Sequence, residues 1–350
     1  MTVLRPTRQV RDTRITLAHG SGGKAMHDLI EDVFVATFDS AALDPLEDQA
    51  RLPLLELMAQ GDRLAFTTDS YVVDPLFFAG GDIGRLAVAG TVNDLAVGGA
   101  KPLYLSCAII AEEGLDIALL RRVARSMQDT AAEAGVKLVT GDTKVVPRGA
   151  ADKLFINTAG IGVIPEGVSI AADRARPGDV ILVNGTIGDH GVAILQERAD
   201  LGFATKIASD CHPLNGLVAT LLASCPEVHC LRDATRGGVA TVLNEFAAAS
   251  RQCLRIRETD LPIRDEVRGV CELLGLDPLY MANEGKLVAV VPGSDADRAL
   301  AALRSHPHGR EAAIIGEVAE TPEETVVLTT PFGGSRILDM LVGDQLPRIC

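Results

Sequence analysis

Four short acidic clusters contain the residues of this chain whose types and spacing best suit chemistry. Each follows an apolar stretch, most have glycine nearby, and their aspartates are Asp69 in TTDS, Asp94 in VNDLAVGG, Asp142 in TGDTK and Asp233 in LRDATRGG. Taken singly, each is more often a loop-capping residue. If they converge, mutual repulsion raises their pKa values unless cations lie among them. Oxygen ligands without histidine or thiolate suit Mg²⁺, which accompanies nucleotide phosphates.

Two glycine-rich segments could hold phosphate groups through backbone amides. Their residues are Gly22, Gly23 and Lys24 in HGSGGK, and Arg236, Gly237 and Gly238 in TRGG. The first is not a Walker A loop, because Ala25 follows the lysine, and a flexible N-terminal turn is an equally good interpretation. The second opens a predicted helix, whose positive end favours anions.

A lysine and a glutamate could form a proton-transfer pair if burial tunes their pKa values. They are Lys144 in GDTK and Glu284 in NEGK, although this glutamate is also typical of a surface turn. His190 in GDHG is typical of a structural loop histidine. The neighbouring Cys211 and His212 lack the two further ligands that a zinc site needs.

The chain ends in LPRIC, so its last side chain is the thiol of Cys350. Chain termini are seldom packed, and an exposed thiol is a chemical liability unless it is used. The other six cysteines lie in or beside apolar segments, and we expect them to be buried. The 20 residues from Pro331 to Cys350 read as a mobile tail that adds little to either core. Fully extended, such a tail spans about 65 Å.

Composition and charge exclude several classes of function. The chain has 350 residues, 47% apolar and 23% charged, which is long enough for two folded domains. Its net charge of -14 and scarce aromatic residues argue against nucleic-acid binding. We find neither a secretory signal nor an apolar run long enough to span a membrane. Seven scattered cysteines without a CxxC pair indicate a cytoplasmic protein with reduced thiols.

The spacing of apolar residues predicts elements of both kinds in each half of the chain. Helices are expected over 26–38, 82–97, 116–134, 236–250 and 295–306. Strands are expected over 63–70, 102–110, 136–142, 153–164, 180–185, 285–292, 312–318 and 325–330. The fold class is therefore mixed α/β or α+β. Its expected parts are a glycine-rich loop and helix at 1–43, an N-terminal domain at 44–165, a C-terminal α/β domain at 172–330, and the tail at 331–350.

The motifs HGSGGK, TTDS, VNDLAVGGAKP, GDTKVV, IGDHG, RDATRGGVATVLNE and NEGK follow in this order over about residues 17 to 350. The set resembles the ATP-dependent superfamily that contains aminoimidazole ribonucleotide synthetase and selenophosphate synthetase. With the terminal PRIC, it resembles the hydrogenase-maturation branch, the carbamoyl dehydratases. The selenium branch has a reactive cysteine in the N-terminal glycine-rich loop, and this loop has none.

This resemblance implies a two-domain aminoimidazole ribonucleotide synthetase-like fold, with an N-terminal sheet that pairs in a homodimer and a C-terminal domain that closes over ATP. It implies Mg²⁺ held by Asp69, Asp94, Asp233 and Asp48, although the sequence after Asp48 departs from the expected small residues. It implies nucleotide contacts from Gly22, Gly23, Lys24, Asp69, Asp94, Asp142, Thr143, Arg236, Gly237 and Gly238. The implied partners are the carbamoyltransferase HypF and an iron-carrying HypC–HypD scaffold.

The resemblance also explains the terminal thiol, with Lys144 and Glu284 acting on a carboxamide attached to Cys350. Such a carboxamide cannot simply lose water, because oxide is a very poor leaving group. Phosphoryl transfer from ATP makes phosphate the leaving group and yields a thiocyanate, a source of cyanide ligands for [NiFe]-hydrogenase iron. Two alternatives stay open: a small-molecule ATP-dependent synthetase or kinase of the same superfamily, and a non-catalytic thiol carrier.

Overall fold

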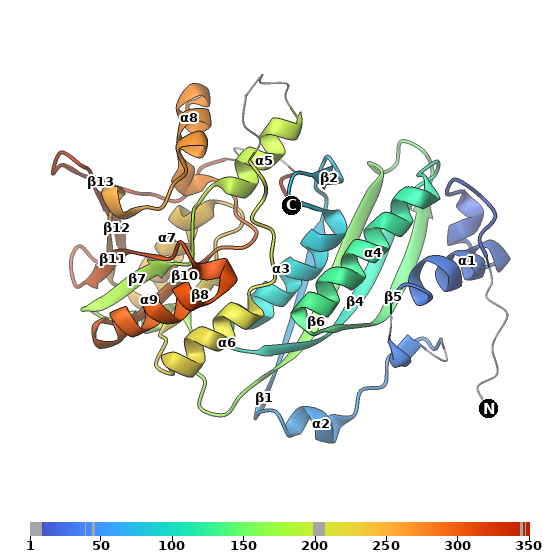
Figure 1. The fold of residues 1–350 in the computed structure, drawn as a ribbon, viewed down its shortest axis with the longest axis horizontal. Helices are drawn as coiled ribbons and strands as arrows, with labels where there is room; N and C mark the ends of the chain where they lie inside the picture. Colours follow the sequence, from blue (N-terminus) through green and yellow to red (C-terminus); the bar gives the residue numbers. More distant parts are fainter. Residues whose placement is uncertain (1–8, 39, 44–45, 199–206, 344–345, 347) are drawn as a thin grey trace.

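The computed structural model describes residues 9–38, 40–43, 46–198, 207–343, 346 and 348–350. Parts of the predicted N-terminal segment and of the predicted tail lie outside these residues. The described residues form two layered units. The C terminus lies between these units, beside β2 (Phe77–Phe78) (Figure 1).

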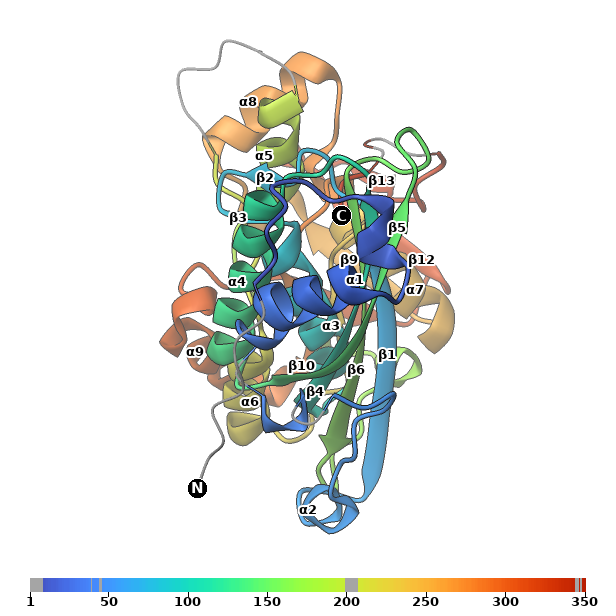
Figure 2. The ribbon, with the colours of Figure 1, turned by 90° about the vertical axis from the view of Figure 1, so that its right-hand side faces the viewer.

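The N-terminal unit is a four-stranded sheet whose described helices lie on one face (Figure 2). Its strand order is β1 (Arg63–Tyr71), β6 (Leu154–Ile164), β4 (Lys101–Glu112) and β5 (Lys137–Val146). All pairs are antiparallel except β4 with β5. Short elements flank it: α1 (Lys24–Leu29), η2 (Ile30–Val35), α2 (Leu54–Met58) and β3 (Gly81–Asp82).

Two helices, α3 (Ile83–Val97) and α4 (Ile117–Ala134), cover the inner face of this sheet. Asp82 caps α3, because its carboxylate accepts hydrogen bonds from the Gly84 and Arg85 amides at 2.7 and 3.2 Å. Asp116 caps α4 in the same way, and Gly135 ends it in the left-handed conformation with φ 70°. The helix predictions at these two places are confirmed.

The C-terminal unit has a seven-stranded sheet with helices on both faces. Its order is β13 (Ser335–Ile337), β12 (Thr325–Thr329), β9 (Cys253–Arg257), β11 (Ala313–Ala319), β7 (Asp179–Val183), β10 (Leu287–Pro292) and β8 (Cys230–Asp233). The helices are α5 (Asp189–Arg198), α6 (Asn215–Ser224), α7 (Gly238–Ser250), α8 (Asp265–Leu274) and α9 (Ala296–Ser305). Mixed α and β structure in two domains, as the sequence predicts, is confirmed.

Helix α3 joins the two units. Most of its side chains are buried, and Ala96 and Val97 at its end belong to the apolar core that also contains Leu214 and Leu217 of the C-terminal unit. Burial of apolar surface on both sides fixes this helix against both domains. The polar residues in its last turns therefore lie at the domain junction.

Some sequence predictions were wrong or incomplete. The helix expected over 26–38 is divided into two shorter pieces, α1 and the π-helical turn η2. The apolar stripe continues through both pieces, but the backbone hydrogen-bond spacing changes from one to the next, which the side-chain pattern does not reveal. Helices α5, α6 and α8 were not predicted. Among the described residues, no helix is long and apolar enough to cross a membrane.

Candidate active site

Three of the predicted aspartates converge at the domain junction. Asp69 comes from β1, Asp94 from the end of α3 and Asp233 from the end of β8. Asp94 and Asp233 line a cleft of about 520 Å³. Thr67 of the neighbouring strand donates a hydrogen bond of 3.0 Å to Asp94 and so fixes its carboxylate.

The electrostatics of this cleft favour a cation. Burial raises the pKa of Asp94, and Asp69 adds to the rise. Burial raises the pKa of Asp233 to about 7, with further contributions from Asp94 and Asp69. Like charges in a partly dry site disfavour one another's ionisation, and a divalent cation would relieve that repulsion. A donor set made only of carboxylate oxygens fits Mg²⁺.

The Arg236–Gly238 segment borders the same cleft at the start of α7. Gly237 and Gly238 have φ values of 76° and 61°. A Cβ on Gly238 would lie 2.4 Å from the Leu279 carbonyl oxygen, so the backbone approach there requires glycine. Backbone amides at the positive end of a helix suit phosphate oxygens.

Glu284 is buried beside this cluster, in the loop before β10, with 3% of its surface exposed. Its backbone amide donates to Asp210 at 3.0 Å, and its carbonyl accepts from Asn93 of α3 at 3.2 Å. Burial, followed by the charges of Asp210, Asp233 and Asp69, raises its pKa well above the ordinary value. Oε1 has no hydrogen-bond partner among the described residues. Glu284 is thus a buried carboxyl group able to hold a proton, and the surface-turn interpretation was wrong.

The C-terminal residues are docked against the domain junction. The Val72 amide donates to the Cys350 carbonyl at 3.0 Å, and the Asp74 amide donates to the Arg348 carbonyl at 3.4 Å. Arg348 Nε donates back to the Val72 carbonyl at 3.0 Å and its guanidinium pairs with Asp152. These contacts hold the end of the chain like a short added strand.

Cys350 therefore lies beside the acidic cleft. It is half-buried and lines a cavity of about 360 Å³ together with Ser70 and Arg236. Arg236 also lines the 520 Å³ cleft, so one side chain borders both spaces. Leu338 and Ile349 are buried in the C-terminal and N-terminal cores, respectively. The expectation that the tail adds little to either core was therefore wrong, whereas its mobility stays a prediction.

Other predicted site residues lie apart from the cleft within one chain. Lys144 is exposed on β5, at the opposite edge of the sheet from β1, and pairs with Asp142 at 3.1 Å. Thr143 is buried on the other face of that strand. The glycine-rich segment Gly22–Lys24 also lies on the β5 side, where Gly20 packs against Val145.

Asp48 is likewise outside the cleft. It is exposed, between η3 (Ala41–Leu43) and α2, and it does not line either cavity at the junction. Its predicted role as a metal ligand has no support within a single chain.

Three buried polar residues beside Glu284 have no place in the site predicted from the sequence, where His190 is interpreted as a structural loop histidine. Asp210 forms an ion pair of 2.9 Å with Lys286, both largely buried. Burial opposes ionisation of Asp210, but the Lys286 ammonium, His190 and the hydrogen bond from the Glu284 amide together hold its pKa below the ordinary value. His190 is fully buried and reaches the Ile349 carbonyl at 2.8 Å. The sequence gives no signal for these contacts, because the partners are far apart along the chain.

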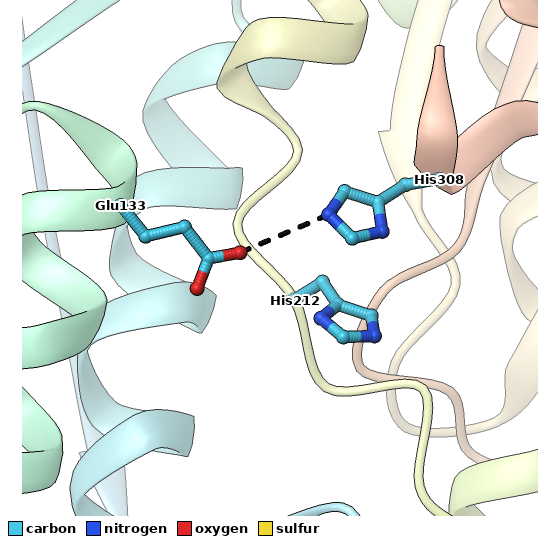
Figure 3. Close-up of side chains that lie close together, drawn as sticks. All are labelled: Glu133, His212 and His308. Carbon is cyan, nitrogen blue, oxygen red and sulfur yellow. Dashed lines mark ion pairs between the residues drawn. The ribbon is translucent and has the colours of Figure 1, made fainter.

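A second polar cluster, formed by Glu133, His212 and His308, joins the domains on another side of the junction (Figure 3). The two imidazoles stack with ring centroids 4.2 Å apart. Arg85 lies among them, 2.7 Å from His212 Nδ1 and 3.0 Å from Glu133 Oε2. Because a guanidinium already pairs with these groups, we interpret the cluster as an interdomain contact rather than a metal site.

Known proteins resemble this chain over almost its whole length. Residues 47–164 match the AIR synthase related protein N-terminal domain, and residues 176–329 match its C-terminal domain. The carbamoyl dehydratase HypE of Rhodobacter capsulatus is 57% identical over 97% of this chain and 99% of its own length. The Escherichia coli K12 protein of that name is 55% identical over 96% of this chain and 99% of its own length.

This chain belongs to the HypE family.

Solved structures extend the relationship to three dimensions. A HypE structure in complex with ATP has a TM-score of 0.91 and 53% identity, covering 95% of this chain and 99% of its own. A HypE–HypF complex matches with a TM-score of 0.78 and 45% identity, covering 91% of this chain and 100% of its own. The family and the two-domain fold predicted from the sequence are thereby confirmed. Two thiamine-monophosphate kinase structures, at 22% and 19% identity, share the fold alone, with TM-scores of 0.59 and 0.58.

Proposed function

We propose that this chain is an ATP-dependent carbamoyl dehydratase, which converts a carboxamide on Cys350 into a thiocyanate that supplies cyanide ligands for [NiFe]-hydrogenase iron. One observation carries the proposal: Arg236 borders both the cavity of Cys350 and the acidic cleft. A terminal thiol is thereby placed next to groups suited to phosphate and Mg²⁺. Relatives named carbamoyl dehydratase and a relative solved with ATP support it.

The chemistry divides into two steps. The carboxamide oxygen of Cys350-S-C(O)NH₂ attacks the γ-phosphorus of ATP; the P–O bond to ADP breaks, and the nitrogen gives up one proton. The second nitrogen proton then leaves with cleavage of the C–O bond, which releases phosphate and forms Cys350-S-C≡N. The net change is loss of one water from the thiol adduct, coupled to ATP hydrolysis. Holding the two reacting groups in line supplies much of the rate enhancement.

The cleft residues have distinct proposed roles. Asp69, Asp94 and Asp233 would hold Mg²⁺, which supplies charge neutralisation for the triphosphate when bound. Arg236 and the amides at the start of α7 would bind phosphate oxygens from the side of Cys350. The remaining predicted nucleotide contacts, on the β5 side, stay predictions.

Glu284 is the proposed base for the nitrogen protons. Burial and neighbouring carboxylates raise its pKa well above the ordinary value, which makes its carboxylate a stronger base than an exposed glutamate. Its Oε1 has no hydrogen-bond partner among the described residues and is free to accept one. Lys144 is proposed to assist, and because it is exposed and lies apart from Glu284 within one chain, this role would require a second subunit to bring the two residues together.

Replacing Glu284 by glutamine is expected to leave ATP affinity within about twofold and to lower carboxamide conversion by roughly 100-fold or more. The amide keeps the shape of the side chain but cannot accept the proton. Isothermal titration with ATP and mass spectrometry of the terminal peptide measure the two quantities. Loss of ATP binding in a folded Glu284→Gln protein would make Glu284 a nucleotide ligand instead.

The overall function is tested by intact mass spectrometry of the C-terminal peptide. The protein is incubated with carbamoyl phosphate, the HypF carbamoyltransferase, ATP and Mg²⁺. A gain of the carboxamide, followed by ATP-dependent loss of about 18 Da, one water by the stoichiometry above, is the expected result. If the carboxamide adduct never lost water, the chain would be a non-catalytic thiol carrier instead. A HypC–HypD scaffold remains the predicted cyanide acceptor.

The uncovered face of the N-terminal sheet supports the predicted homodimer. Within the described part of the chain, helices cover one face only, and on the other Leu64, Phe66 and Ile110 are 60%, 72% and 41% exposed. Lys144 pairs with Ile110 across β5 and β4 and so lies on the same face. An apolar sheet face of this kind is suited to a second copy of the sheet.

Phe66→Asp is expected to weaken the dimer roughly 30-fold or more, because it would bury a charge in the apolar face. Sedimentation velocity over a range of concentrations measures the change. Leu273→Asp is the matched control, since Leu273 is 67% exposed on α8 of the other domain. If Phe66→Asp and Leu273→Asp dimerised with equal affinity, the proposed interface on the N-terminal sheet would be wrong.

A further inference from the structure

His190, at the start of α5, lies between the docked C terminus and Glu284. Its imidazole is fully buried and packs edge-on against Phe78, with ring centroids 5.5 Å apart. Its Nε2 is 2.8 Å from the Ile349 carbonyl oxygen and 3.9 Å from Glu284 Oε1. One ring nitrogen therefore faces both the terminus and the buried carboxyl group.

The hydrogen bonds around His190 determine which nitrogen carries the proton. A carbonyl oxygen only accepts, so Nε2 must donate its hydrogen to Ile349. Burial lowers the pKa of His190, which keeps the ring neutral and leaves Nδ1 as an acceptor for the Ser209 hydroxyl at 2.8 Å. The Cys211 amide in turn donates to Ser209 Oγ at 3.1 Å. This chain of bonds holds the ring in the tautomer that binds the terminus.

The same geometry determines the partner of Glu284. A distance of 3.9 Å is too long for a hydrogen bond, and Oε1 has no other partner among the described residues. The single hydrogen on Nε2 cannot serve both the Ile349 carbonyl and the Glu284 carboxyl. While the terminus is docked, His190 donates to the terminus and leaves Glu284 able to accept a proton from another group.

His190 is one of two side chains of α5 that hold the terminus, because Arg198 Nη2 donates to the Arg348 carbonyl while His190 binds Ile349, the residue next to Cys350. The Val72 and Asp74 amides hold the terminus through backbone groups that truncation of a side chain does not remove. The Arg348 bonds come from the tail itself. His190 contributes from the body of the protein, through a buried bond to the residue next to Cys350.

We propose that His190 is a positioning residue. Its Nε2–H bond to the Ile349 carbonyl holds Cys350 in the active site and keeps the imidazole from donating the same hydrogen to the Glu284 carboxylate. The catalytic part rests on the function proposed above, whereas the docking part does not. If the imidazole loses its hydrogen bond to the Ile349 carbonyl, the terminus is released and the Nε2 hydrogen can be donated to Glu284 instead. Both effects lower the rate of dehydration without removing any group that contacts ATP.

The test is the rate at which iodoacetamide alkylates Cys350 in the full-length protein, followed by mass spectrometry of the terminal peptide. Removal of one buried hydrogen bond in His190→Ala should speed alkylation about tenfold. His190→Gln should restore the wild-type rate, because its amide nitrogen can replace Nε2 as donor. Equal rates in wild type and His190→Ala, or no rescue by glutamine, would overturn the proposal.

His229→Ala is the matched control. His229 is also buried and pairs with Asp179 at 2.7 Å, but it does not contact the terminus. Its alkylation rate should equal that of wild type, and thermal melting verifies the fold of each variant. Carboxamide conversion measured in parallel should fall in His190→Ala and recover in His190→Gln. Alkylation needs neither ATP nor the carboxamide, so failure of the docking contact is distinguishable from failure of the proposed function.

Discussion

Replacement of Cys350 by alanine is expected to abolish thiocyanate formation completely while leaving ATP binding intact. The other six cysteines are buried, and they cannot substitute for a thiol in the active-site cavity. Burial raises the pKa of Cys107 to about 12 and that of Cys271 to about 11, so both stay protonated and unreactive at neutral pH. Mass spectrometry of all cysteine peptides after incubation with HypF, carbamoyl phosphate and ATP measures the result.

Alanine is preferable to truncation for this experiment. The Cys350 carbonyl accepts the Val72 amide and Ile349 is buried, so deletion would disturb packing as well as chemistry. Cys271→Ala is the matched control and should retain full conversion. Cyanide delivery by the Cys350→Ala protein would show that the terminal thiol is not the carrier.

Asp94→Asn is expected to lower ATP hydrolysis roughly 100-fold or more, because it removes a charged oxygen from the proposed Mg²⁺ site. Phosphate release at saturating ATP and Mg²⁺ measures the loss. Asp62→Asn, at an exposed residue of the loop before β1, should hydrolyse ATP at the wild-type rate. Near-normal hydrolysis in a folded Asp94→Asn protein would refute the metal assignment.

The same substitution should stabilise the metal-free protein at alkaline pH. Asp233 has a pKa of about 7 in the folded state, above its value in the unfolded chain. The unfolded chain therefore loses this proton at lower pH, and the free energy of unfolding falls as the pH rises from about 4 to 7. Without the charge of Asp94 this fall is smaller, by on the order of 1 kcal/mol. Urea unfolding in EDTA at pH 5 and pH 8 measures the difference.

The sequence by itself determined the family and much of the local structure, although not α5, α6 and α8. Asp82 and Asp116 cap helices through amides two or three residues away, so short motifs suffice to predict where these helices begin. The strands over 63–70 and 153–164 were predictable because apolar residues run through them up to turn signals at their ends. The ordered motifs and the terminal cysteine likewise identified the family and the acidic residues.

Only the tertiary structure decided which of those residues meet. Asp69, Asp94 and Asp233 come together because α3 packs against both domains, whereas the sheet order leaves Lys144 at the far edge. The burial of Glu284 and the contact of His190 with Ile349 depend on segments far apart in the chain. A sequence pattern predicts contacts only between residues that lie within a few positions of one another in the chain. Burial, pKa shifts and long-range hydrogen bonds depend on how distant segments pack together, and a short sequence pattern does not contain that information.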